Sequence, residues 1–284
     1  MTNTSIKAIV FDLDGTLYEE TAHFDYFAKC IENKLPVERK SDFKRDYHLA
    51  VNFNHPLQIG RVYDVEKDLI LVQQNEYVTE AYYWDGQLVS HEKLDKLYPE
   101  KISFNHHSML NVGDLWWVPM SIAAHYGLSG ALNNQAFLET RDFMVSDQFN
   151  MNPIPGLKEL LQSLQEHVYI ALLTNSPEPD SEVLLSKLGI QHLFHKKIFN
   201  GKKPTKTQTW FEGLKMEIDA HFPEILSIGD NEINDIRPVR SLGCKTIYID
   251  THDLGNSTSA HYVVNKMRDA FPIIQSLTKI KGAS

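Results

Sequence analysis

The sequence has little cysteine, no excess of basic residues and no long apolar run. Its two cysteines, Cys30 and Cys244, are far apart in 284 residues and lack metal-binding spacing, so we interpret them as buried reduced thiols. The net charge of −9 argues against nucleic acid as a partner, because phosphate backbones are bound by basic stripes. The N-terminal segment lacks the basic and small-residue regions of a secretory signal, and no segment has the length of a membrane helix. We therefore expect a cytoplasmic protein without nucleic-acid or membrane partners.

The composition is that of a globular protein with a hydrophobic core. Hydrophobic residues make up 42% of the chain and charged residues 23%. The length suits one large domain or two smaller ones. A small anionic ligand stays compatible with the negative charge, because it needs only a few local donors.

Residues 153–284 alternate between short apolar runs and helical segments. Strands are expected at 167–175, 195–201, 224–230 and 244–250, and helices at 179–189, 205–218 and 232–243. Strands that alternate with helices form crossover units, which build a parallel sheet. The apolar segment 6–14 is one more buried strand and should join this sheet. The pattern predicts the α/β class, with a Rossmann-like parallel sheet as the core.

The intervening residues 18–152 follow a different pattern. Helical spacing appears in three segments, at 23–35, 113–127 and 133–149. By contrast, 69–90 is rich in β-forming residues and contains the turn pair Asp85-Gly86. We expect an inserted, mainly helical module with a β-hairpin near 69–90. The core would then consist of residues 1–17 and 153–284.

Polar residues stand where the predicted core strands end. The first strand ends in Asp12 and Asp14, and the later strand ends supply Thr174, Asn175, Lys202, Lys203, Asp230 and Asp235. In an open parallel sheet, ligands bind beyond the carboxyl ends of the strands. The order of these residues therefore predicts one cleft that gathers carboxylates, a hydroxyl group and an ammonium group.

Several carboxylates in one cleft cannot all remain ionised without a cation. A hard divalent ion with oxygen ligands meets this need, and Mg²⁺ commonly combines carboxylates, waters and a substrate phosphate. We expect Asp12 and Asp230 to bind Mg²⁺ directly, and Asp14 to bind it through the backbone carbonyl. Asp235 would either orient metal-bound waters or brace Lys203.

The remaining groups suit phosphoryl transfer, in which positioning and charge stabilisation do most of the work. Thr174, Asn175 and Lys203 are the candidates for holding phosphoryl oxygens. Asp12 is the candidate nucleophile, which would form an aspartyl-phosphate.

Strand alternation would send Asp14 to the opposite face from Asp12, unless the strand has already ended and turned. Gly15 permits such a turn, and Asp14 could then act as general acid and base. Asn231 would either touch the metal shell or cap the helix that follows it.

These residues resemble the motifs of the haloacid dehalogenase-like hydrolase superfamily. "DLDGTL" (12–17) is similar to the first motif, with Asp12 as nucleophile and Asp14 as acid and base. "LLTNS", "KKP" and "GDNEIND" are similar to the second, third and fourth motifs, in family order. Within "KKP", Lys203 is the better match because proline follows it. The motifs frame about half of the chain.

The resemblance implies a function as well as a fold. Members with an acid at the position of Asp14 resemble phosphatases and phosphomutases, whereas the dehalogenases lack this pattern. An insert between the first and second motifs resembles a cap that closes over the site and selects substrates. The insert here, 18–152, is larger than the compact helical cap common in relatives. We expect a Mg²⁺-dependent phosphatase that hydrolyses a small phosphorylated metabolite.

Two alternatives stay open on the sequence. A sugar phosphomutase would carry the same motifs and return the phosphoryl group to its substrate. A phospho-receiver domain also uses acids, a hydroxyl group and a lysine around Mg²⁺, but its acid pair and its phosphoacceptor lie on different strands. The second acid pair after the lysine and the long insert fit a receiver poorly.

Overall fold

The computed structural model describes residues 5–105, 107–254 and 260–279 and divides the chain into two compact units. Unit 1 combines residues 1–20 and 144–284, and unit 2 comprises residues 21–143. The expected boundaries lay three residues earlier at the first junction and nine residues later at the second. The role of unit 2 as a cap stays a prediction.

Unit 1 is built on a six-stranded sheet whose strand order is β10-β9-β8-β1-β6-β7. The strands are β1 (Ala8–Phe11), β6 (Tyr169–Leu173), β7 (Lys196–Ile198), β8 (Ile225–Gly229), β9 (Lys245–Ile249) and β10 (Tyr262–Val264). Every pair of neighbours runs parallel. The predicted α/β class with a Rossmann-like parallel sheet is confirmed.

The central strand β1 joins the two halves of this sheet. Phe11 lies level with Leu172 of β6 on one side and Ile228 of β8 on the other. All four residues of β1 are buried, as expected of an apolar strand covered on both faces. The chain continues to β6 and β7 on one side of β1 and to β8, β9 and β10 on the other. This reversal of strand order creates a crevice at the carboxyl end of β1.

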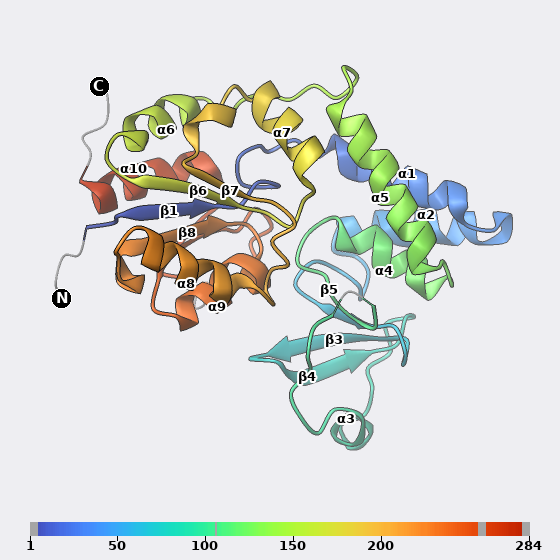
Figure 1. Cartoon of the computed structure of the whole chain (residues 1–284). Coiled ribbons are helices and arrows are strands. Elements are labelled where there is room, and N and C mark those ends of the chain that lie inside the picture. The colour runs from blue at the N-terminus through green and yellow to red at the C-terminus, as the bar shows by residue number, and fades with distance from the viewer. Residues whose placement is uncertain (1–4, 106, 255–259, 280–284) are drawn as a thin grey trace. The chain divides into compact units, whose positions relative to one another are not determined.

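Helices cover both faces of the sheet, with α6 and α10 on one side and α8 and α9 on the other (Figure 1). The helices of unit 1 are α6 (Leu157–Gln165), α7 (Glu178–Lys187), α8 (Thr207–Glu217), α9 (Arg237–Ser241) and α10 (Met267–Thr278). Ala8 and Val10 of β1 pack with Phe211 and Leu214 of α8 and with Val239 of α9. The alternate residues of β1 therefore anchor the layer that contains α8 and α9.

The predicted helix 232–243 consists of two shorter pieces. Residues Glu232–Ile236 form a π-helical turn, labelled η3, and α9 begins at Arg237. Pro238 stands in the first turn of α9 and has no N–H to donate to the carbonyl group four residues earlier. The helical ladder is therefore interrupted just after Asp235.

Unit 2 contains helices and a sheet of its own. Its helices are α1 (Ala22–Lys34), α2 (Val37–Val51), α3 (His91–Leu97), α4 (Trp117–His125) and α5 (Gly130–Val145), which runs two residues into unit 1. Its strands β2 (Val62–Asp64), β3 (Leu69–Gln74), β4 (Tyr77–Tyr82) and β5 (Met109–Asn111) form an antiparallel sheet in the order β4-β3-β2-β5. The β structure is thus more extensive than one hairpin near 69–90.

The turn of the β3–β4 hairpin also differs from the expectation. It lies at Asn75 and Glu76, which both have positive φ angles, 53° and 66°. Asp85-Gly86 forms a separate tight turn, closed by one antiparallel bridge between Tyr82 and Leu88. Among the described residues, every helix is too short or too polar to cross a membrane.

The buried carboxylate of Asp64 holds the turn between β2 and β3. Its Oδ1 accepts the backbone N–H groups of Glu66 and Lys67, each at 3.0 Å. Its Oδ2 accepts the Tyr98 hydroxyl at 2.7 Å and the Lys67 ammonium at 3.0 Å. A side chain that is only 2% exposed therefore satisfies four donors.

We predict that Asp64→Ala lowers the free energy of unfolding by about 3 kcal/mol, because it leaves buried donors without an acceptor. Urea unfolding followed by circular dichroism measures the change. The control Asp85→Ala removes an exposed carboxylate that accepts one N–H group, from Gln87. It should change stability by less than about 0.5 kcal/mol. Equal effects of the two substitutions would contradict this account of the turn.

Candidate active site

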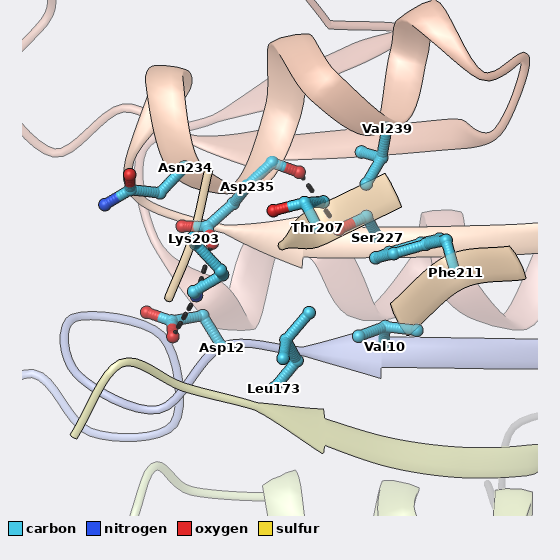
Figure 2. A pocket seen from close by; sticks show the side chains of 10 residues that line it. All are labelled: Val10, Asp12, Leu173, Lys203, Thr207, Phe211, Ser227, Asn234, Asp235 and Val239. Atoms are coloured by element: carbon cyan, nitrogen blue, oxygen red, sulfur yellow. Dashed lines mark hydrogen bonds and ion pairs between the residues drawn. The ribbon is translucent and has the colours of Figure 1, made fainter. Parts of the chain in front are cut away.

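Side chains from four neighbouring loops meet at the carboxyl edge of the unit 1 sheet. Asp12 follows β1 directly, and its N–H group donates to the carbonyl of Ile228 on β8 at 2.9 Å. Thr174 follows β6 and Asp230 follows β8. Lys203 lies in the loop after β7. Because the strands are parallel and adjacent, these residues lie at one edge, where Figure 2 shows Asp12 and Lys203 pointing toward each other.

The chain turns immediately after Asp12. The N–H groups of Thr16 and Leu17 both donate to the carbonyl of Leu13, at 3.3 and 2.9 Å, and Gly15 has a φ angle of +73°. Strand alternation has therefore ended before Asp14. The sequence left open whether the strand continues through Asp14 or ends before it. In the structure, the strand has ended and turned.

Lys203 is the buried cation of the site. Its Nζ lies 2.6 Å from Asp12 Oδ1 and 2.5 Å from Asp235 Oδ1, and the residue is 3% exposed. Burial alone would lower the pKa of Lys203, but the two carboxylates outweigh this effect and raise the pKa above its ordinary value. Lys202, by contrast, is exposed and has a φ angle of 52°. Of the two lysines, Lys203 is therefore the one that lies among the carboxylates.

Asp12 has an unusual protonation equilibrium. Burial raises its pKa from an ordinary value of 3.8 to about 7. The Lys203 ammonium opposes this rise, whereas the carboxylates of Asp235 and Asp14 add to it. The positive charge of Lys203 is thus insufficient to keep Asp12 ionised below about pH 7.

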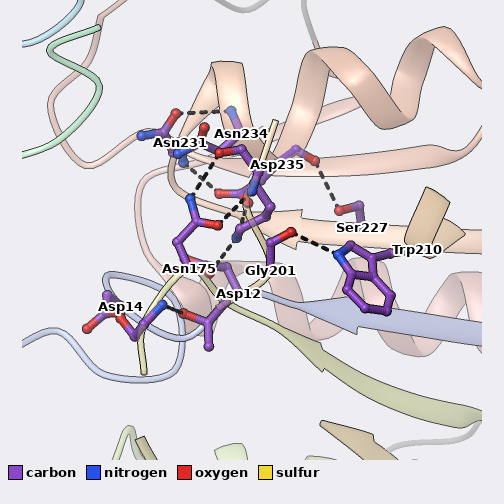
Figure 3. Close-up of polar contacts among 12 residues, drawn as sticks. Asp12, Asp14, Asn175, Gly201, Trp210, Ser227, Asn231, Asn234 and Asp235 are labelled. Carbon is purple, nitrogen blue, oxygen red and sulfur yellow. Dashed lines mark hydrogen bonds and ion pairs between the residues drawn. The ribbon is translucent and has the colours of Figure 1, made fainter. Parts of the chain in front are cut away.

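Asp235 is held in place from three directions. Besides its ion pair with Lys203, its Oδ2 accepts the N–H of Asn231 at 3.2 Å. The Ser227 hydroxyl of β8 donates to the Asp235 carbonyl at 3.0 Å. Asn231 accepts the N–H of Asn234 on its side chain at 3.1 Å and so caps the π-helical turn (Figure 3). In the structure, Asp235 braces Lys203 and Asn231 caps the helical turn. Each of these is one of the two roles expected from the sequence.

Three carboxylates could together hold a cation. Oxygens of Asp12, Asp230 and Asp235 all lie within 4.8 Å of one another. An all-oxygen set with an excess of negative charge suits a hard divalent ion such as Mg²⁺. The Asp14 side chain lies outside this group, and metal binding through the Asp14 backbone carbonyl stays a prediction. Asp235 belongs to the group although the sequence suggested only a supporting role.

Thr174 and Asn175 connect the loops of the site. The Thr174 hydroxyl accepts the N–H of Ser176 at 3.1 Å, and the Thr174 carbonyl accepts the N–H of Gly201 at 2.8 Å. The side chain of Asn175 bonds to both backbone groups of Lys203, accepting from its N–H at 2.7 Å and donating to its carbonyl at 3.1 Å. In this structure the Asn175 amide therefore positions the lysine loop.

The loop before Lys203 is also tied to helix α8, a contact that sequence reasoning missed. The indole N–H of Trp210 donates to the carbonyl of Gly201 at 2.8 Å (Figure 3). Trp210 lies in a helix with an amphipathic pattern, so its sequence context indicated only packing. Nothing in the local sequence distinguishes this tryptophan from an ordinary core residue.

A small cavity lies behind Lys203, between the sheet and helices α8 and α9 (Figure 2). Its polar lining includes Lys203, Asp235, Ser227 and Thr207, whose hydroxyl is fully buried and has no hydrogen-bond partner among the described residues. The cavity has room for about one water molecule, which is too little for a phosphate group. The cavity therefore cannot hold the phosphoryl group of a substrate.

Comparison with protein families decides the identity. A model of the haloacid dehalogenase-like hydrolases matches residues 6–243, which include every loop of this site. The chain belongs to this family. The resemblance inferred from the four motifs is confirmed, and the protein is a hydrolase.

Solved structures with the same fold span nearly the whole hydrolase. The HAD hydrolase YfnB from Bacillus subtilis, bound to magnesium, is 14% identical, with a TM-score of 0.54 and coverage of 95% of this chain and 99% of that one. A predicted phosphoglycolate phosphatase from Haemophilus somnus is 17% identical, with a TM-score of 0.51 and coverage of 97% and 100%. A HAD phosphatase from Thermococcus onnurineus is 13% identical, with a TM-score of 0.51 and coverage of 95% and 99%. No curated protein sequence matches the chain.

Gly15 gives a test of how tightly the site is packed. A Cβ atom at this position would lie 2.1 Å from Asp230 Oδ2, so the carboxylate would have to move. We predict that Gly15→Ala leaves the fold intact but weakens Mg²⁺ binding at least about tenfold, because one oxygen of the candidate cation site is displaced. Mg²⁺ titration by calorimetry measures the affinity.

The matched control is Gly127→Ala. Gly127 has a similar φ angle, +81°, but a Cβ atom there would meet no atom within 4 Å. Both substitutions place a side chain at positive φ and should cost about 1 kcal/mol of stability. Only the change at Gly15 should affect the metal. Equal Mg²⁺ affinity in the two variants would contradict the proximity of Gly15 and Asp230.

Proposed function

We propose that this hydrolase is a Mg²⁺-dependent phosphatase that acts on a small phosphorylated metabolite through an aspartyl-phosphate. The observation that carries the proposal is the buried Lys203, which is paired with Asp12 and Asp235 beside the carboxylate of Asp230. This arrangement offers a nucleophile, a fixed cation and an oxygen site for a divalent ion at one edge of the sheet. Charge stabilisation of this kind dominates phosphoryl transfer.

The residues of the chain account for each step. One Asp12 oxygen accepts from Lys203, and the other attacks phosphorus in line with the leaving oxygen. Asp14 gives a proton to the leaving oxygen and later removes one from the water that hydrolyses the aspartyl-phosphate. Lys203 balances the negative charge of the transferred group. Mg²⁺, held by Asp12, Asp230, Asp235 and the backbone of Asp14, would supply the remaining positive charge.

Similar proteins support this proposal in part. Two of the solved structures with this fold are a predicted phosphoglycolate phosphatase and a HAD phosphatase, and a third is bound to magnesium. At 13–17% identity they share the fold, so the substrate is inferred here only as a class. The acid at position 14 favours phosphate chemistry over dehalogenation, because a leaving oxygen needs a proton and a halide does not.

Asp12→Asn tests the proposed nucleophile. We predict that it abolishes the Mg²⁺-dependent release of phosphate from 4-nitrophenyl phosphate, with a loss of at least about 10⁴-fold. The control Asp250→Asn changes another buried carboxylate, at the end of β9, which accepts the N–H of Leu254. It should retain activity within about threefold. Substantial activity in Asp12→Asn would refute the assignment, and turnover that requires a sugar bisphosphate would favour the phosphomutase.

The protonation of Asp12 gives a second test. Because its pKa is about 7 in the metal-free chain, a cation that binds below pH 7 must displace a proton. We predict that the apparent Mg²⁺ dissociation constant rises about tenfold for each pH unit below 7 and levels off above it. Calorimetric titration between pH 5.5 and 8.5, in buffers of different ionisation enthalpy, measures the affinity and the proton release. An affinity that does not change with pH would contradict the raised pKa.

A further inference from the structure

The carboxylate of Asp14 is held by two hydroxyl groups. The Tyr18 hydroxyl donates to Asp14 Oδ1 through a short hydrogen bond. The Ser176 hydroxyl donates to Asp14 Oδ2 at 2.6 Å. Tyr18 is fully buried and Ser176 is 9% exposed. Both oxygens of this acid therefore have a fixed neutral donor, whereas Asp12 is paired with an ammonium group.

Both donors are themselves fixed by the backbone. Tyr18 follows the turn in which the N–H of Leu17 donates to the carbonyl of Leu13, so it lies one helical turn from Asp14. Ser176 donates its N–H to the Thr174 hydroxyl at 3.1 Å, and its carbonyl accepts the N–H of Asn200 at 3.0 Å. The two hydroxyl groups come from different loops and have little freedom to follow a carboxylate that moves.

We propose that Tyr18 and Ser176 are positioning residues that fix the carboxyl plane of Asp14 for proton transfer. The inference rests on the proposed function. In the step concerned, the bond between Asp12 and phosphorus forms while the bond from phosphorus to the leaving oxygen breaks. The proton passes from the Asp14 carboxyl group to that oxygen. Each carboxylate oxygen has two lone-pair sites, so a hydroxyl donor on each leaves a place for the transferred proton.

The physical reason lies in the geometry of general acid catalysis. A side-chain carboxyl group rotates readily about its last bond, and a proton donor is effective only within hydrogen-bond reach of the leaving oxygen. Two donors, one on each oxygen, stop this rotation. Lys203 is engaged with Asp12 and Asp235, so it is not available to orient Asp14. The hydroxyl groups of Tyr18 and Ser176 are the side-chain donors that hold the two oxygens of Asp14.

Substrates with different leaving groups test the proposal. An alkoxide leaving group needs a proton as it departs, whereas 4-nitrophenolate departs without one. We predict that Tyr18→Phe and Ser176→Ala each lower kcat/KM for 2-phenylethyl phosphate about tenfold, and for 4-nitrophenyl phosphate less than about twofold. Ser176→Thr keeps the hydroxyl group and should restore the ratio. Losses of equal size on both substrates would overturn the proposal, because general structural damage acts on both.

A matched control and a double mutant sharpen the result. Tyr169→Phe removes a hydroxyl group that donates to Glu217 at the opposite end of the sheet, and it should leave both substrates unaffected. In the Asp14→Asn background, Tyr18→Phe should cause no further loss on the alkyl phosphate, because its effect acts through Asp14. Additive losses would overturn the proposal. Failure of the proposed function would give a different result, because the Asp12→Asn variant would then retain phosphatase activity.

Discussion

The ion pairs of Lys203 with Asp12 and Asp235 are the interaction on which the rest of the site depends. A buried ammonium group is costly to desolvate, and so is each carboxylate beside it. At 2.6 and 2.5 Å the three groups offset much of each other's cost. Removing the lysine would leave two acids, with Asp230 close by, at one buried edge of the sheet. The loops must therefore place Lys203 accurately before the acids can be used.

Much of the polar structure at the strand ends serves that placement. Asn175 bonds to both backbone groups of Lys203, and Trp210 holds the carbonyl of Gly201 two residues earlier. Ser227 and Asn231 hold Asp235 on the other side of the ammonium group. The loop after β6 thus fixes the loop that carries Lys203, and the segment from β8 onward fixes its own Asp235. Substituting Asn175 would therefore disturb the position of Lys203.

The parts of this structure differ in how far the sequence reveals them. Strands β1, β6, β8 and β9 are predictable because each is a short run of mostly buried apolar residues that ends in a polar group, whereas the mostly exposed β10 was not predicted. The sheet of unit 2 is only partly visible, because β2 and β5 have three residues each and show no periodicity. The bonds from Asn175 to Lys203 and from Ser176 to Asp14 join residues 28 and 162 positions apart. No local pattern encodes such pairs, although the turn after Gly15 does place Tyr18 near Asp14.

Asp12 and Asp14 show how two acids with one residue between them acquire different surroundings. Asp12 extends the ladder of β1, lies beside an ammonium group and belongs to the oxygen cluster that suits a cation. Asp14 lies past the turn, where its two oxygens accept hydroxyl groups. A carboxylate that binds a cation and attacks phosphorus cannot also carry a proton at that moment. The turn at Gly15 separates the two tasks that we propose for Asp12 and Asp14, because it ends the strand before Asp14 and gives each acid its own donors.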